Sequence, residues 1–514
     1  MDHHHAAVPG WTVNTEVTLN MKLLTNLHVL VLGLGDSGLA MVRWCAMQGA
    51  QVTVVDNREQ PPGLASLHNE GIAATFIHGN FDAALMDDHS IKAVFKSPGL
   101  SPEQVQAVWT AAKQRGLWLG TELSLFTHAL SHLAAERDYR PHIVAITGTN
   151  GKTTVTTLTS LLLKSAGMHV AMAGNIGPSL LDTLRDNLDN LPKAWVLELS
   201  SFQLDDEDTF EPTAACILNL TQDHLDWHAD MHSYGKAKSH IYGKQAVAIM
   251  PRGDDVVAGL LPKDAAKKKT ELRRIMTFGV DMPQVAGDYG LENVNGMTWL
   301  VKAAAPETEG KRLVDEDLWI QRLMPADALR LRGQHNALNA LAALALASSC
   351  GASLAPMLHA LREYRGEPHR MQSIGVVNDI EYIDDSKGTN VGATLAAVQS
   401  LGTDKKLILI LGGDGKGQDF SPLRQVINRC VRAVVLMGKD APRIEQAVSG
   451  LGITVLHAVD MQAAVHTASQ HAQTADIVLL SPACSSLDMF KNYAERGSQF
   501  EACVQGLILE VGHA

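Results

Sequence analysis

The sequence predicts an α/β protein made of three doubly wound domains with mainly parallel sheets. Short apolar runs suited to buried strands alternate with stretches in which apolar residues recur at helical spacing. Two of these runs enter glycine-rich turns that open a helix, at 29–38 and 143–154. A chain of 514 residues is too long for one hydrophobic core, and we expect domains at 1–140, 141–366 and 367–514.

The N-terminal domain is predicted from a strand–turn–helix–strand unit. The apolar strand 29–32 enters the turn Gly33-Leu-Gly-Asp-Ser-Gly38, a helix follows, and the next strand, 51–55, ends at Asp56. A G-x-G-x-x-G turn with a later acidic residue is typical of a Rossmann-like unit, which places a diphosphate at a helix N-terminus. The turn suits an NAD pyrophosphate with Asp56 on the ribose, the diphosphate of a uridine nucleotide, or no ligand at all.

The central domain is predicted to bind a nucleoside triphosphate. An apolar run from Ile143 leads into a turn that ends in Gly151-Lys-Thr153, and a helical pattern follows. Backbone N–H groups of such a turn close on phosphate oxygens; Lys152 would reach the β- and γ-phosphates, and the Thr153 hydroxyl would lie on Mg²⁺. The run departs from G-x-x-x-x-G-K-[ST] at Ile146, where the pattern needs glycine. We expect a P-loop-type ATPase whose ATP contacts are Gly148, Thr149, Asn150, Gly151, Lys152, Thr153 and Thr154.

Three charged side chains follow this loop at positions suited to its chemistry. Glu198 ends the strand 195–198 and could hold a hard cation together with Thr153, although it could also be an ordinary strand-end glutamate. His224 is flanked by acids after the strand 215–219, and it is either a second metal ligand or a structural histidine. On a predicted helix, Lys238 is assigned no more than a cationic role towards phosphate.

The third domain is predicted from the strands 407–411, 433–437 and 477–480, which alternate with helical patterns. Ligands of open α/β sheets lie beyond the carboxyl ends of such strands. Polar or glycine-rich runs occupy these places at Asp384–Asn390, Gly412–Lys416 and Ser481–Phe490. Cys484 has no identifiable base partner, which argues against a thiol nucleophile.

Composition excludes several other classes of protein. Aromatic residues make up 5% of the chain and the net charge is -12, which argues against binding to nucleic acid. The six cysteines lack a CxxC pair, so neither a thiolate zinc site nor a disulfide scaffold is expected. No apolar run approaches the ~20 residues of a spanning helix, and the N-terminus, with its tract His3–His5, lacks a signal-peptide core. We expect a cytoplasmic protein in which the basic stretch 263–274 is a solvated loop.

Together the motifs resemble the Mur ligases along nearly the whole chain; the phosphate loop is also similar to that of folylpolyglutamate synthetases. The resemblance is carried by Gly33–Gly38 with Asp56-Asn-Arg58, Lys96-Ser-Pro-Gly99, Gly148–Thr153, Gly174-Asn-Ile-Gly177, Leu197–Leu204, Asp385-Ser-Lys387 and Leu480–Asp488. The last run is the most discriminating and favours the branch of the family that adds D-glutamate to UDP-N-acetylmuramoyl-L-alanine. The regions 263–274 and 281–330 look like insertions without an assigned role.

The resemblance also implies roles for single residues. The uridine diphosphate substrate would contact Asp36, Ser37, Asp56, Arg58, Ser97 and Asn175. ATP and two Mg²⁺ ions would be served by Lys152, Thr153, Glu198 and His224, with further ATP contacts from Asn336, Arg370 and Asp385. D-Glutamate would be placed by Lys387, Thr389, Ser486, Leu487 and Tyr493, the last of which stands where phenylalanine is expected. In the family the lysine that matches Lys238 is carbamylated, which turns a cation into an anion able to bridge metal-bound groups.

The implied activity is ATP-dependent amide-bond formation through an acyl phosphate, in peptidoglycan precursor synthesis by a monomer. Three other readings remain. An NAD-dependent oxidoreductase would leave Gly151-Lys-Thr153 without a role. A P-loop ATPase acting as a binding module would leave the first glycine turn without one. A sister Mur ligase that adds a different amino acid is disfavoured by the run around Ser481-Pro482.

Overall fold

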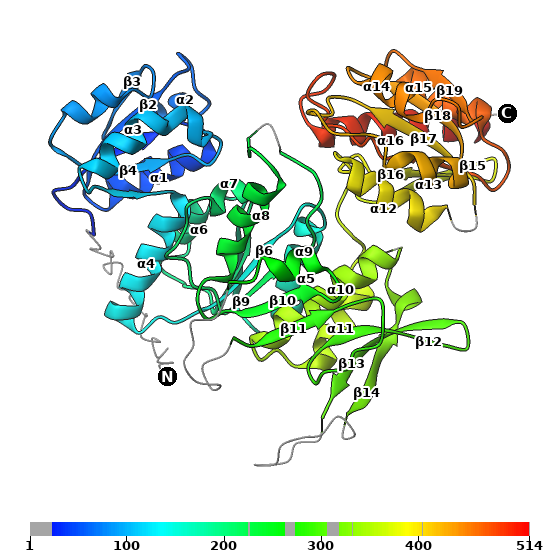
Figure 1. Ribbon diagram of the computed structural model, residues 1–514, viewed down its shortest axis with the longest axis horizontal. Helices are drawn as coiled ribbons and strands as arrows, with labels where there is room; N and C mark the ends of the chain where they lie inside the picture. Colours follow the sequence, from blue (N-terminus) through cyan, green and yellow to red (C-terminus); the bar gives the residue numbers. More distant parts are fainter. Residues whose placement is uncertain are drawn as a thin grey trace, which may run out of the picture. The chain divides into compact units, whose positions relative to one another are not determined.

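The computed structural model describes residues 23–224, 227–262, 273–305, 318–331, 333–402 and 405–512 (Figure 1). The chain forms two compact units. The first takes the chain up to Leu125 together with the short segment Leu180–Leu191. The second takes Phe126–Ser179 and everything from Pro192 onward. Each unit is an α/β structure, in agreement with the predicted class.

In its described residues, the first unit contains a five-stranded parallel sheet of order β3-β2-β1-β4-β5. Its strands are β1 His28–Leu32, β2 Gln51–Asp56, β3 Ala74–His78, β4 Ile91–Lys96 and β5 Trp118–Gly120. Its helices are α1 Asp36–Met47, α2 Leu64–Asn69, the 3₁₀ turn η1 Ala83–Asp87 and α3 Pro102–Gln114. Because β2 and β4 lie on opposite sides of β1, the strand order reverses there, and a crevice for a ligand is expected beyond the carboxyl ends of β1 and β4.

The segment Leu180–Leu191 joins the first unit although its neighbours in sequence belong to the second. It carries α6 Leu180–Asp186, which packs against α1. Arg43 of α1 donates from Nη1 to Asp182 Oδ2 at 2.8 Å, and the same guanidinium pairs with Glu70. The backbone N–H of Leu181 donates to Glu122 Oε1 at 2.9 Å. Charge pairs and packing thus attach this segment to the N-terminal fold.

Helix α4, Glu122–Arg137, crosses the boundary between the two units, so the second unit begins within it. The described residues of the second unit then form a nine-stranded sheet. The order is β14-β13-β12-β11-β10-β9-β6-β8-β7. The parallel strands are β6 His142–Thr147, β7 Val170–Gly174, β8 Ala194–Glu198, β9 Ala214–Ile217, β10 Val247–Pro251, β11 Ile275–Phe278 and β12 Tyr289–Val294. The helices are α5 Lys152–Ser165, α7 Ser201–Leu204, α8 Met231–Ser239, η2 His240–Tyr242, α9 Asp255–Gly259, η5 Ala326–Ala328, α10 Gln334–Ser349 and α11 Leu354–Glu363.

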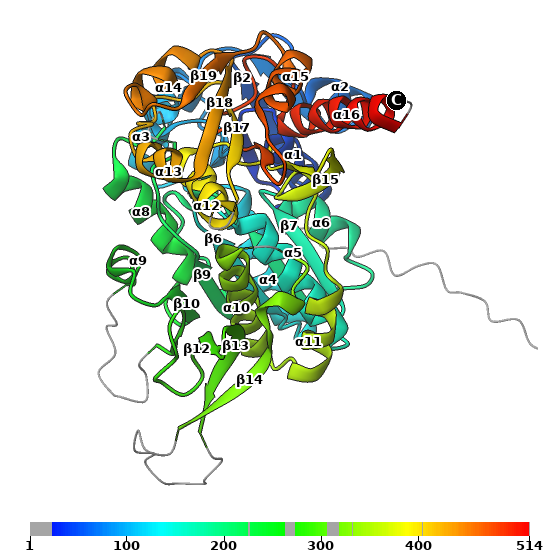
Figure 2. The same cartoon turned by 90° about the vertical axis from the view of Figure 1, so that its right-hand side faces the viewer.

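The central sheet is covered on both faces because its strands are apolar throughout. Val144 and Ile146 of β6 share one core with Val155 of α5, and α10 and α11 complete this layer (Figure 2). Successive side chains of a strand point to opposite faces. Trp195 of β8 accordingly faces the other way, where its ring lies 5.1 Å from Phe126 of α4 in an edge-to-face contact.

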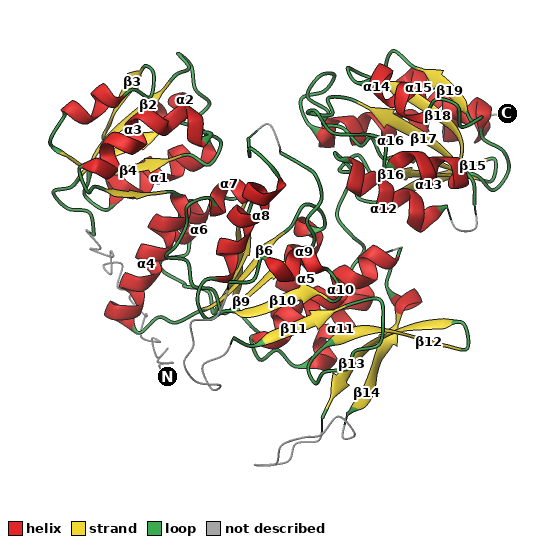
Figure 3. Ribbon diagram, in the orientation of Figure 1, coloured by secondary structure: helices red, strands yellow, loops and turns green. Residues whose placement is uncertain are grey.

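Two antiparallel strands extend the sheet where the sequence indicated an insertion without a role. β13 Met297–Ala304 pairs with β12, and β14 Trp319–Pro325 pairs with β13 (Figure 3). The described parts of the region 281–330 therefore lengthen the sheet beyond its parallel portion. Alternation in this region is interrupted by charged residues, as in Glu292 of β12 and Arg322 of β14, which pair across the intervening strand β13 at 2.7 Å.

The C-terminal part of the second unit has a six-stranded sheet in the described chain, with order β15-β16-β20-β17-β18-β19 and an antiparallel β15. Its strands are β15 Gln372–Val377, β16 Ile380–Asp384, β17 Leu407–Gly412, β18 Val431–Met437, β19 Thr454–His457 and β20 Ile477–Leu480. Leu409 faces the layer of α12 Val391–Leu401, α13 Leu423–Cys430 and α14 Ala441–Val448. The neighbouring Ile408 and Ile410 face the layer of α15 Met461–His471 and α16 Tyr493–Gly512. The alternation explains why uninterrupted apolar runs form buried strands here.

Some expectations fall on residues that the structure does not describe: the His3–His5 tract, most of 263–274, and Arg332 before α10. The last two residues of the basic stretch, Arg273 and Arg274, are described; Arg274 is exposed, but Arg273 is buried instead of solvated. Its guanidinium donates to the carbonyl oxygens of Tyr242, Gly243, Lys244 and Ala246 at 2.7 to 3.3 Å. Arg273 therefore fixes the turn that follows η2. At the other end of the sheet, the strand expected at 215–219 ends at Ile217, which leaves Asn219 in the following loop.

Candidate active site

The phosphate loop joins β6 to α5, as the sequence predicts. Gly151 precedes the first residue of α5 and has φ +82°, a left-handed conformation that glycine adopts without strain. Lys152 opens the helix, and its Nζ donates to the carbonyl oxygens of Gly148 and Thr149, both at 2.9 Å. The side chain thus folds back over the loop that would hold the phosphates. Burial lowers the pKa of Lys152, while the charges of Glu198 and Asp223 act in the opposite direction.

The loop after β9 holds the phosphate loop from the side. Asn219 accepts from the backbone N–H of Asn150 at 2.8 Å and donates to the Asn150 carbonyl at 3.0 Å. The Thr149 hydroxyl donates to the carbonyl of Thr221 and accepts from its N–H, both at 3.0 Å. These four hydrogen bonds hold the backbone of the phosphate loop in one conformation. A phosphate site requires such a preorganised backbone.

Thr153 and Glu198 meet beside this loop. The Thr153 hydroxyl donates to Glu198 Oε2 at 2.9 Å, and Asn175 Nδ2 donates to Glu198 Oε1 at 2.8 Å. Parallel pairing of β6 with β8 sets the two side chains at the same edge of the sheet. A hydroxyl and a carboxylate are oxygen ligands of the kind that Mg²⁺ takes, with phosphate oxygens and water completing its octahedron. The residues present therefore fit a magnesium ion bound together with a nucleotide.

Lys238 of α8 is buried against the start of the phosphate loop, with 1% of its surface exposed. Its Nζ donates to Thr147 Oγ1 and to the Gly148 carbonyl, both at 3.1 Å, and lies 4.7 Å from the centre of the Tyr234 ring. Burial, followed by the charge of Lys152, lowers the pKa of Lys238 well below its ordinary value. Burial therefore makes the protonated form of Lys238 less favourable than it is in water.

His224 lies in the loop after β9, beside Asp223 of the same loop and Phe202 of α7. Its Nε2 is 3.6 Å from Asp223 Oδ2, and its ring contacts the Phe202 ring edge-on with 4.8 Å between centres. Burial lowers the pKa of His224, Asp223 opposes this, and the charge of Lys416 lowers it further. The neutral imidazole that could bind a metal is thus the favoured form. Lys416, which the sequence placed only within a strand-end run, is close enough to act on His224.

The C-terminal part contributes the end of β16 and the turn that follows. Asp385 is buried, accepts from Ser481 Oγ at 2.8 Å, and accepts from the Met371 N–H at 3.3 Å. Burial raises the pKa of Asp385 to about 7, against the effects of the Ser481 hydrogen bond and the Arg370 charge. Burial and then the charge of Arg370 lower the pKa of Lys387 to about 8.

Lys387 is oriented by the predicted residue Tyr493, together with Arg496, which sequence reasoning did not single out. Its Nζ lies 3.7 Å from the centre of the Tyr493 ring, a cation–π contact. The Tyr493 carbonyl accepts from the Ser386 hydroxyl at 2.7 Å, and the buried Arg496 donates to the Ser386 carbonyl at 2.8 Å. Arg496 also donates to the Cys484 carbonyl at 3.1 Å. No spacing in the sequence marks Arg496, because it lies one helical turn beyond Tyr493 on α16 and far from Ser386 along the chain.

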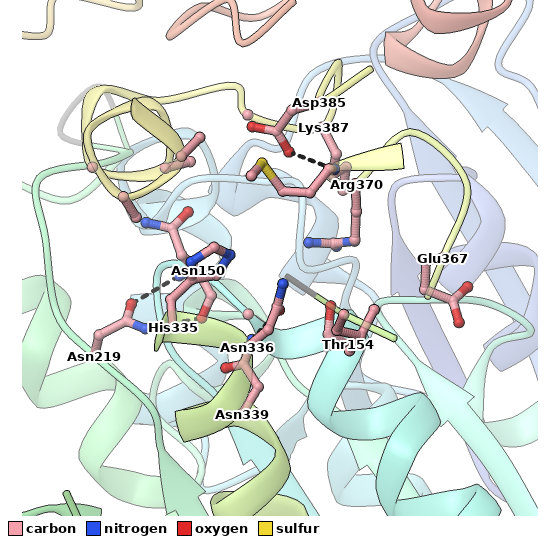
Figure 4. Close-up of a pocket in the computed structure, with 18 of the residues that line it drawn as sticks. Asn150, Thr154, Asn219, His335, Asn336, Asn339, Glu367, Arg370, Asp385 and Lys387 are labelled. Atoms are coloured by element: carbon pink, nitrogen blue, oxygen red, sulfur yellow. Dashed lines mark hydrogen bonds between the residues drawn. The ribbon is translucent and has the colours of Figure 1, made fainter. Parts of the chain in front are cut away.

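A cavity of about 280 Å³ is lined by residues of both the central and the C-terminal part of the second unit. Its walls come from the phosphate loop, α10, the turn after β16 and the start of α12 (Figure 4). Predicted residues among its lining are Asn150, Gly151, Thr154, Asn336, Arg370, Asp385 and Lys387. His335 and Asn339 of α10 also line it, and neither was predicted. Burial lowers the pKa of His335 to about 4, so its ring is neutral at physiological pH.

The first unit has its own cavity, of about 470 Å³, at the carboxyl ends of β1 and β4. The predicted residues Asp36, Ser37, Arg58 and Ser97 line it, as do Asn57 and Gln104, which were not predicted. Asp56 does not line it. Its carboxylate accepts from Leu34 N at 2.7 Å and from the Arg58 guanidinium at 2.7 and 2.8 Å. Burial would raise the pKa of Asp56, but these hydrogen bonds lower it. Asp56 therefore orients Arg58 towards the cavity.

Other predicted residues are placed as follows. Asn175 belongs to the second unit, where it holds Glu198. Thr389 lies two residues after Lys387 and donates its N–H to the Lys387 carbonyl at 2.8 Å. Ser486 is buried and Leu487 is 68% exposed, and both follow β20. In the described ranges no group of three or more His, Cys, Asp and Glu residues is arranged to hold a metal, and no helix is long and apolar enough to cross a membrane.

Family models match three consecutive parts of the chain. Residues 27–117 match the MurD-like N-terminal domain of Mur ligases, residues 146–347 match the Mur ligase middle domain, and residues 369–484 match the Mur ligase glutamate ligase domain. The three matches follow the order of the three sheets.

Relatives of similar length match nearly the whole chain. A UDP-N-acetylmuramoylalanine–D-glutamate ligase of Albidiferax ferrireducens is 54% identical over 96% of this chain and 99% of its own. The ligase of the same name from a Polaromonas species is 47% identical over 96% of this chain and 100% of its own. That of Burkholderia pseudomallei is 50% identical over 94% and 98%.

Solved structures share the fold at low sequence identity. A MurF ligase of Thermotoga maritima in complex with ADP matches with a TM-score of 0.55 and 15% identity, over 95% of this chain and 97% of its own. A pseudomurein peptide ligase type C of Methanothermus fervidus matches with a TM-score of 0.52 and 18% identity, over 94% and 100%. A folylpolyglutamate synthase of Mycobacterium tuberculosis matches with a TM-score of 0.53 and 15% identity, over 74% and 95%.

Proposed function

Because the chain belongs to the Mur ligase family, we propose that it joins D-glutamate to UDP-N-acetylmuramoyl-L-alanine during synthesis of a peptidoglycan precursor. The reaction is ATP-dependent. The alanyl carboxylate takes the γ-phosphoryl group and ADP leaves; the D-glutamate amine then attacks the acyl phosphate, and phosphate and a proton leave as the amide forms. The observation that carries the proposal is the cavity that the phosphate loop shares with Arg370, Asp385 and Lys387.

The phosphate loop and α10 are the proposed ATP site. The N–H groups of Lys152, Thr153 and Thr154 belong to the first turn of α5, where the helix dipole favours negative charge, whereas those of Thr149 and Asn150 already donate to Asn219. When phosphates enter, the Lys152 ammonium would exchange its two carbonyl partners for phosphate oxygens, which offer a stronger charge-assisted bond. Asn336 and Arg370 line the same cavity and would contact the remainder of the nucleotide.

Thr153 and Glu198 are the proposed ligands of a magnesium ion bound with the phosphates. A bound Mg²⁺ supplies charge neutralisation to the β- and γ-phosphate oxygens as the phosphoryl group transfers. Asn175 keeps one Glu198 oxygen engaged, which leaves the other directed at Thr153. His224, in its favoured neutral form, would serve a second ion.

Lys238 is proposed to be carbamylated. A carbamate forms when a neutral amine attacks carbon dioxide, with loss of a proton, and burial lowers the pKa of Lys238 in the direction of that neutral amine. The product would replace a cation with an anion beside Thr147 and the phosphate loop. It would also relieve the repulsion between Lys238 and Lys152, since the charge of Lys152 is among the causes that lower the pKa of Lys238.

The turn after β16 is the proposed site of the amino acid. D-Glutamate brings carboxylates, and Lys387 supplies a cation that Tyr493 holds from one side. Thr389, Ser486 and Leu487 are proposed to complete this site. In the first unit, Asp36, Ser37, Arg58 and Ser97 are proposed to hold the uridine diphosphate, with Asp56 fixing the Arg58 guanidinium. Cytoplasmic location and a monomeric state stay predictions, the second of which light scattering would check.

Amino-acid-dependent release of ADP tests the proposed function. The purified protein is supplied with ATP, Mg²⁺ and UDP-N-acetylmuramoyl-L-alanine, and D-glutamate, L-glutamate, L-alanine and meso-diaminopimelate are added separately. Turnover with D-glutamate alone is expected. Thr153→Ala should remove most of this turnover, whereas Thr157→Ala, the same change one turn later on α5, should not. ATP hydrolysis that is indifferent to every amino acid would contradict the proposal.

A further inference from the structure

Asn390 connects the phosphate loop to the turn that follows β16. It is the residue before α12, it is 3% exposed, and its Oδ1 accepts from the Ala393 N–H at 2.9 Å as an N-terminal cap. The same side chain forms a reciprocal amide pair with Asn150. Asn390 Nδ2 donates to Asn150 Oδ1 at 2.9 Å, and Asn150 Nδ2 donates to Asn390 Oδ1 at 3.2 Å.

The hydrogen-bonding capacity of Asn390 is fully used. An asparagine side chain has two N–H donors and an oxygen that accepts twice. The oxygen is taken by Ala393 and Asn150, one N–H by Asn150, and the other N–H by Asp223 Oδ2 at 3.4 Å. Nothing is left over for a substrate. A side chain in this condition holds other groups in place and does not itself bind a ligand.

The close approach that this arrangement requires depends on Gly392. A Cβ at this position would lie 2.9 Å from Thr221 Oγ1 and 3.3 Å from Asn150 Nδ2. The first turn of α12 therefore rests directly on the loops that shape the phosphate site. Val391, between these two residues, donates its N–H to Gln418 Oε1 at 2.9 Å, which ties the same turn to the loop after β17.

We propose that Asn390 is a positioning residue that couples the phosphate loop to the amino-acid site. The coupling has a short path, because Asn390 directly follows Thr389 and Lys387 lies two residues further back. A phosphate loop ordered by nucleotide fixes Asn150. Asn150 in turn fixes Asn390, and Asn390 fixes the turn that presents the Lys387 ammonium to the amine donor. The inference rests on the proposed ligase reaction only for the identity of that donor.

Asn390→Asp separates coupling from helix capping. Aspartate caps helices as well as asparagine does, so the bond from Ala393 is kept. The new oxygen, however, replaces a donor and faces Asn150 Oδ1 and Asp223 Oδ2, both of which are acceptors. Asp460→Asn is the matched control. Asp460 caps α15 through Ala463 N at 2.8 Å, so this is the reverse exchange at a cap that touches no part of the site.

Steady-state kinetics is the first measurement. Asn390→Asp is expected to lower kcat/KM for D-glutamate by about tenfold to a hundredfold, since a misplaced turn loses both orientation and binding. KM for ATP should change by less than about threefold, because Lys152 and Asn336 are untouched and the Asn150 backbone stays bonded to Asn219 even when its side chain loses Asn390. Asp460→Asn should match the wild type. An equal loss towards both substrates, or no loss, would overturn the inference, and Asn390→Ser gives the same comparison if the first variant does not fold.

Hydrogen exchange supplies a readout that does not depend on the reaction. A non-hydrolysable ATP analogue with Mg²⁺ should slow exchange of backbone amides at 385–394 in the wild type and in Asp460→Asn, but not in Asn390→Asp. If the wild type shows no such protection although the analogue binds, the coupling does not exist. If protection is transmitted but no amino acid gives turnover, the proposed function fails while the coupling stands.

Discussion

The buried carboxyl of Asp385 makes the C-terminal domain pH-sensitive in a direction that can be stated in advance. Burial raises the pKa of this group from 3.8 to about 7, so the folded state holds a proton that the unfolded state releases. Stability is unaffected by this group below pH 3.8 and falls as pH rises towards 7. Each pH unit in between costs about 1.4 kcal/mol, and above pH 7 the total cost is about 4 kcal/mol.

Asp385→Asn should remove this cost. An amide carries no charge at any of these pH values. Its Nδ2 can donate to Ser481 Oγ, which in the wild type donates to the carboxylate. The Ser481 hydroxyl can then donate to Thr394 Oγ1, 3.0 Å away. Exchanging one charged hydrogen bond for a neutral one costs about 1 to 2 kcal/mol. A net gain of about 2 to 3 kcal/mol is left at pH 8, which raises the melting temperature of a domain of this size by roughly 5 to 10 °C.

Differential scanning calorimetry at pH 5, 6, 7 and 8 measures the effect. The gain of Asp385→Asn over the wild type should be similar at pH 8 and pH 7, and it should shrink by about 1.4 kcal/mol per unit as pH falls below 7. Exposed Asp189, changed to Asn, gives the matched control and should show no such trend. A melting difference that is the same at pH 5 and pH 8, or a variant less stable than the wild type at pH 8, would refute the reasoning. If Asp385 contacts the nucleotide, Asp385→Asn should also have a higher KM for ATP than the wild type.

Other predictions follow from neighbouring contacts. Glu198→Gln keeps the shape of the acceptor for Thr153 but loses its charge, so the Mg²⁺ concentration for half-maximal ADP release should rise about tenfold or more; an unchanged magnesium titration would exclude Glu198 as a ligand. Lys238→Arg keeps a cation but cannot form a carbamate, and activity should fall by about tenfold to a hundredfold, with no response to bicarbonate where the wild type responds. Arg273→Lys cannot span the four carbonyl groups of the turn at 242–246, and should cost about 1 to 3 kcal/mol in thermal unfolding, unlike Arg274→Lys.

The parts of the site that the sequence predicts are those that depend on local order along the chain. The turn at 148–153 needs only an apolar strand before it and a helix after it, and the structure has β6 and α5 in these places. Glu198 was placed beside Thr153 because parallel strands end at one edge of a sheet, and the two side chains are 2.9 Å apart. The α/β class followed from the same alternation of strands and helices.

The remaining parts depend on approaches between distant segments. Nothing near Asn390 in the sequence indicates Asn150, and Arg496 meets Ser386 only because α16 packs against the end of β16. The sheet extension of β13 and β14 was missed because its strands carry charged residues and resemble loops. The role of Asp56 towards the uridine nucleotide stays a prediction; the motif did not indicate that its carboxylate accepts hydrogen bonds from Leu34 and Arg58.

The first compact unit is discontinuous along the chain. This limits which parts of the gene can be exchanged by recombination without loss of contacts. Leu180–Leu191 belongs with the N-terminal fold but is encoded inside the central one. A genetic exchange that replaced only residues 1–125 would bring an α1 whose Arg43 no longer met Asp182, and a Glu122 that no longer met the Leu181 N–H. We therefore expect the N-terminal part to be exchanged between genes only together with the central ATP-binding part. Differences in the cavity at β1 and β4 should arise by single substitutions and not by replacement of the whole N-terminal part.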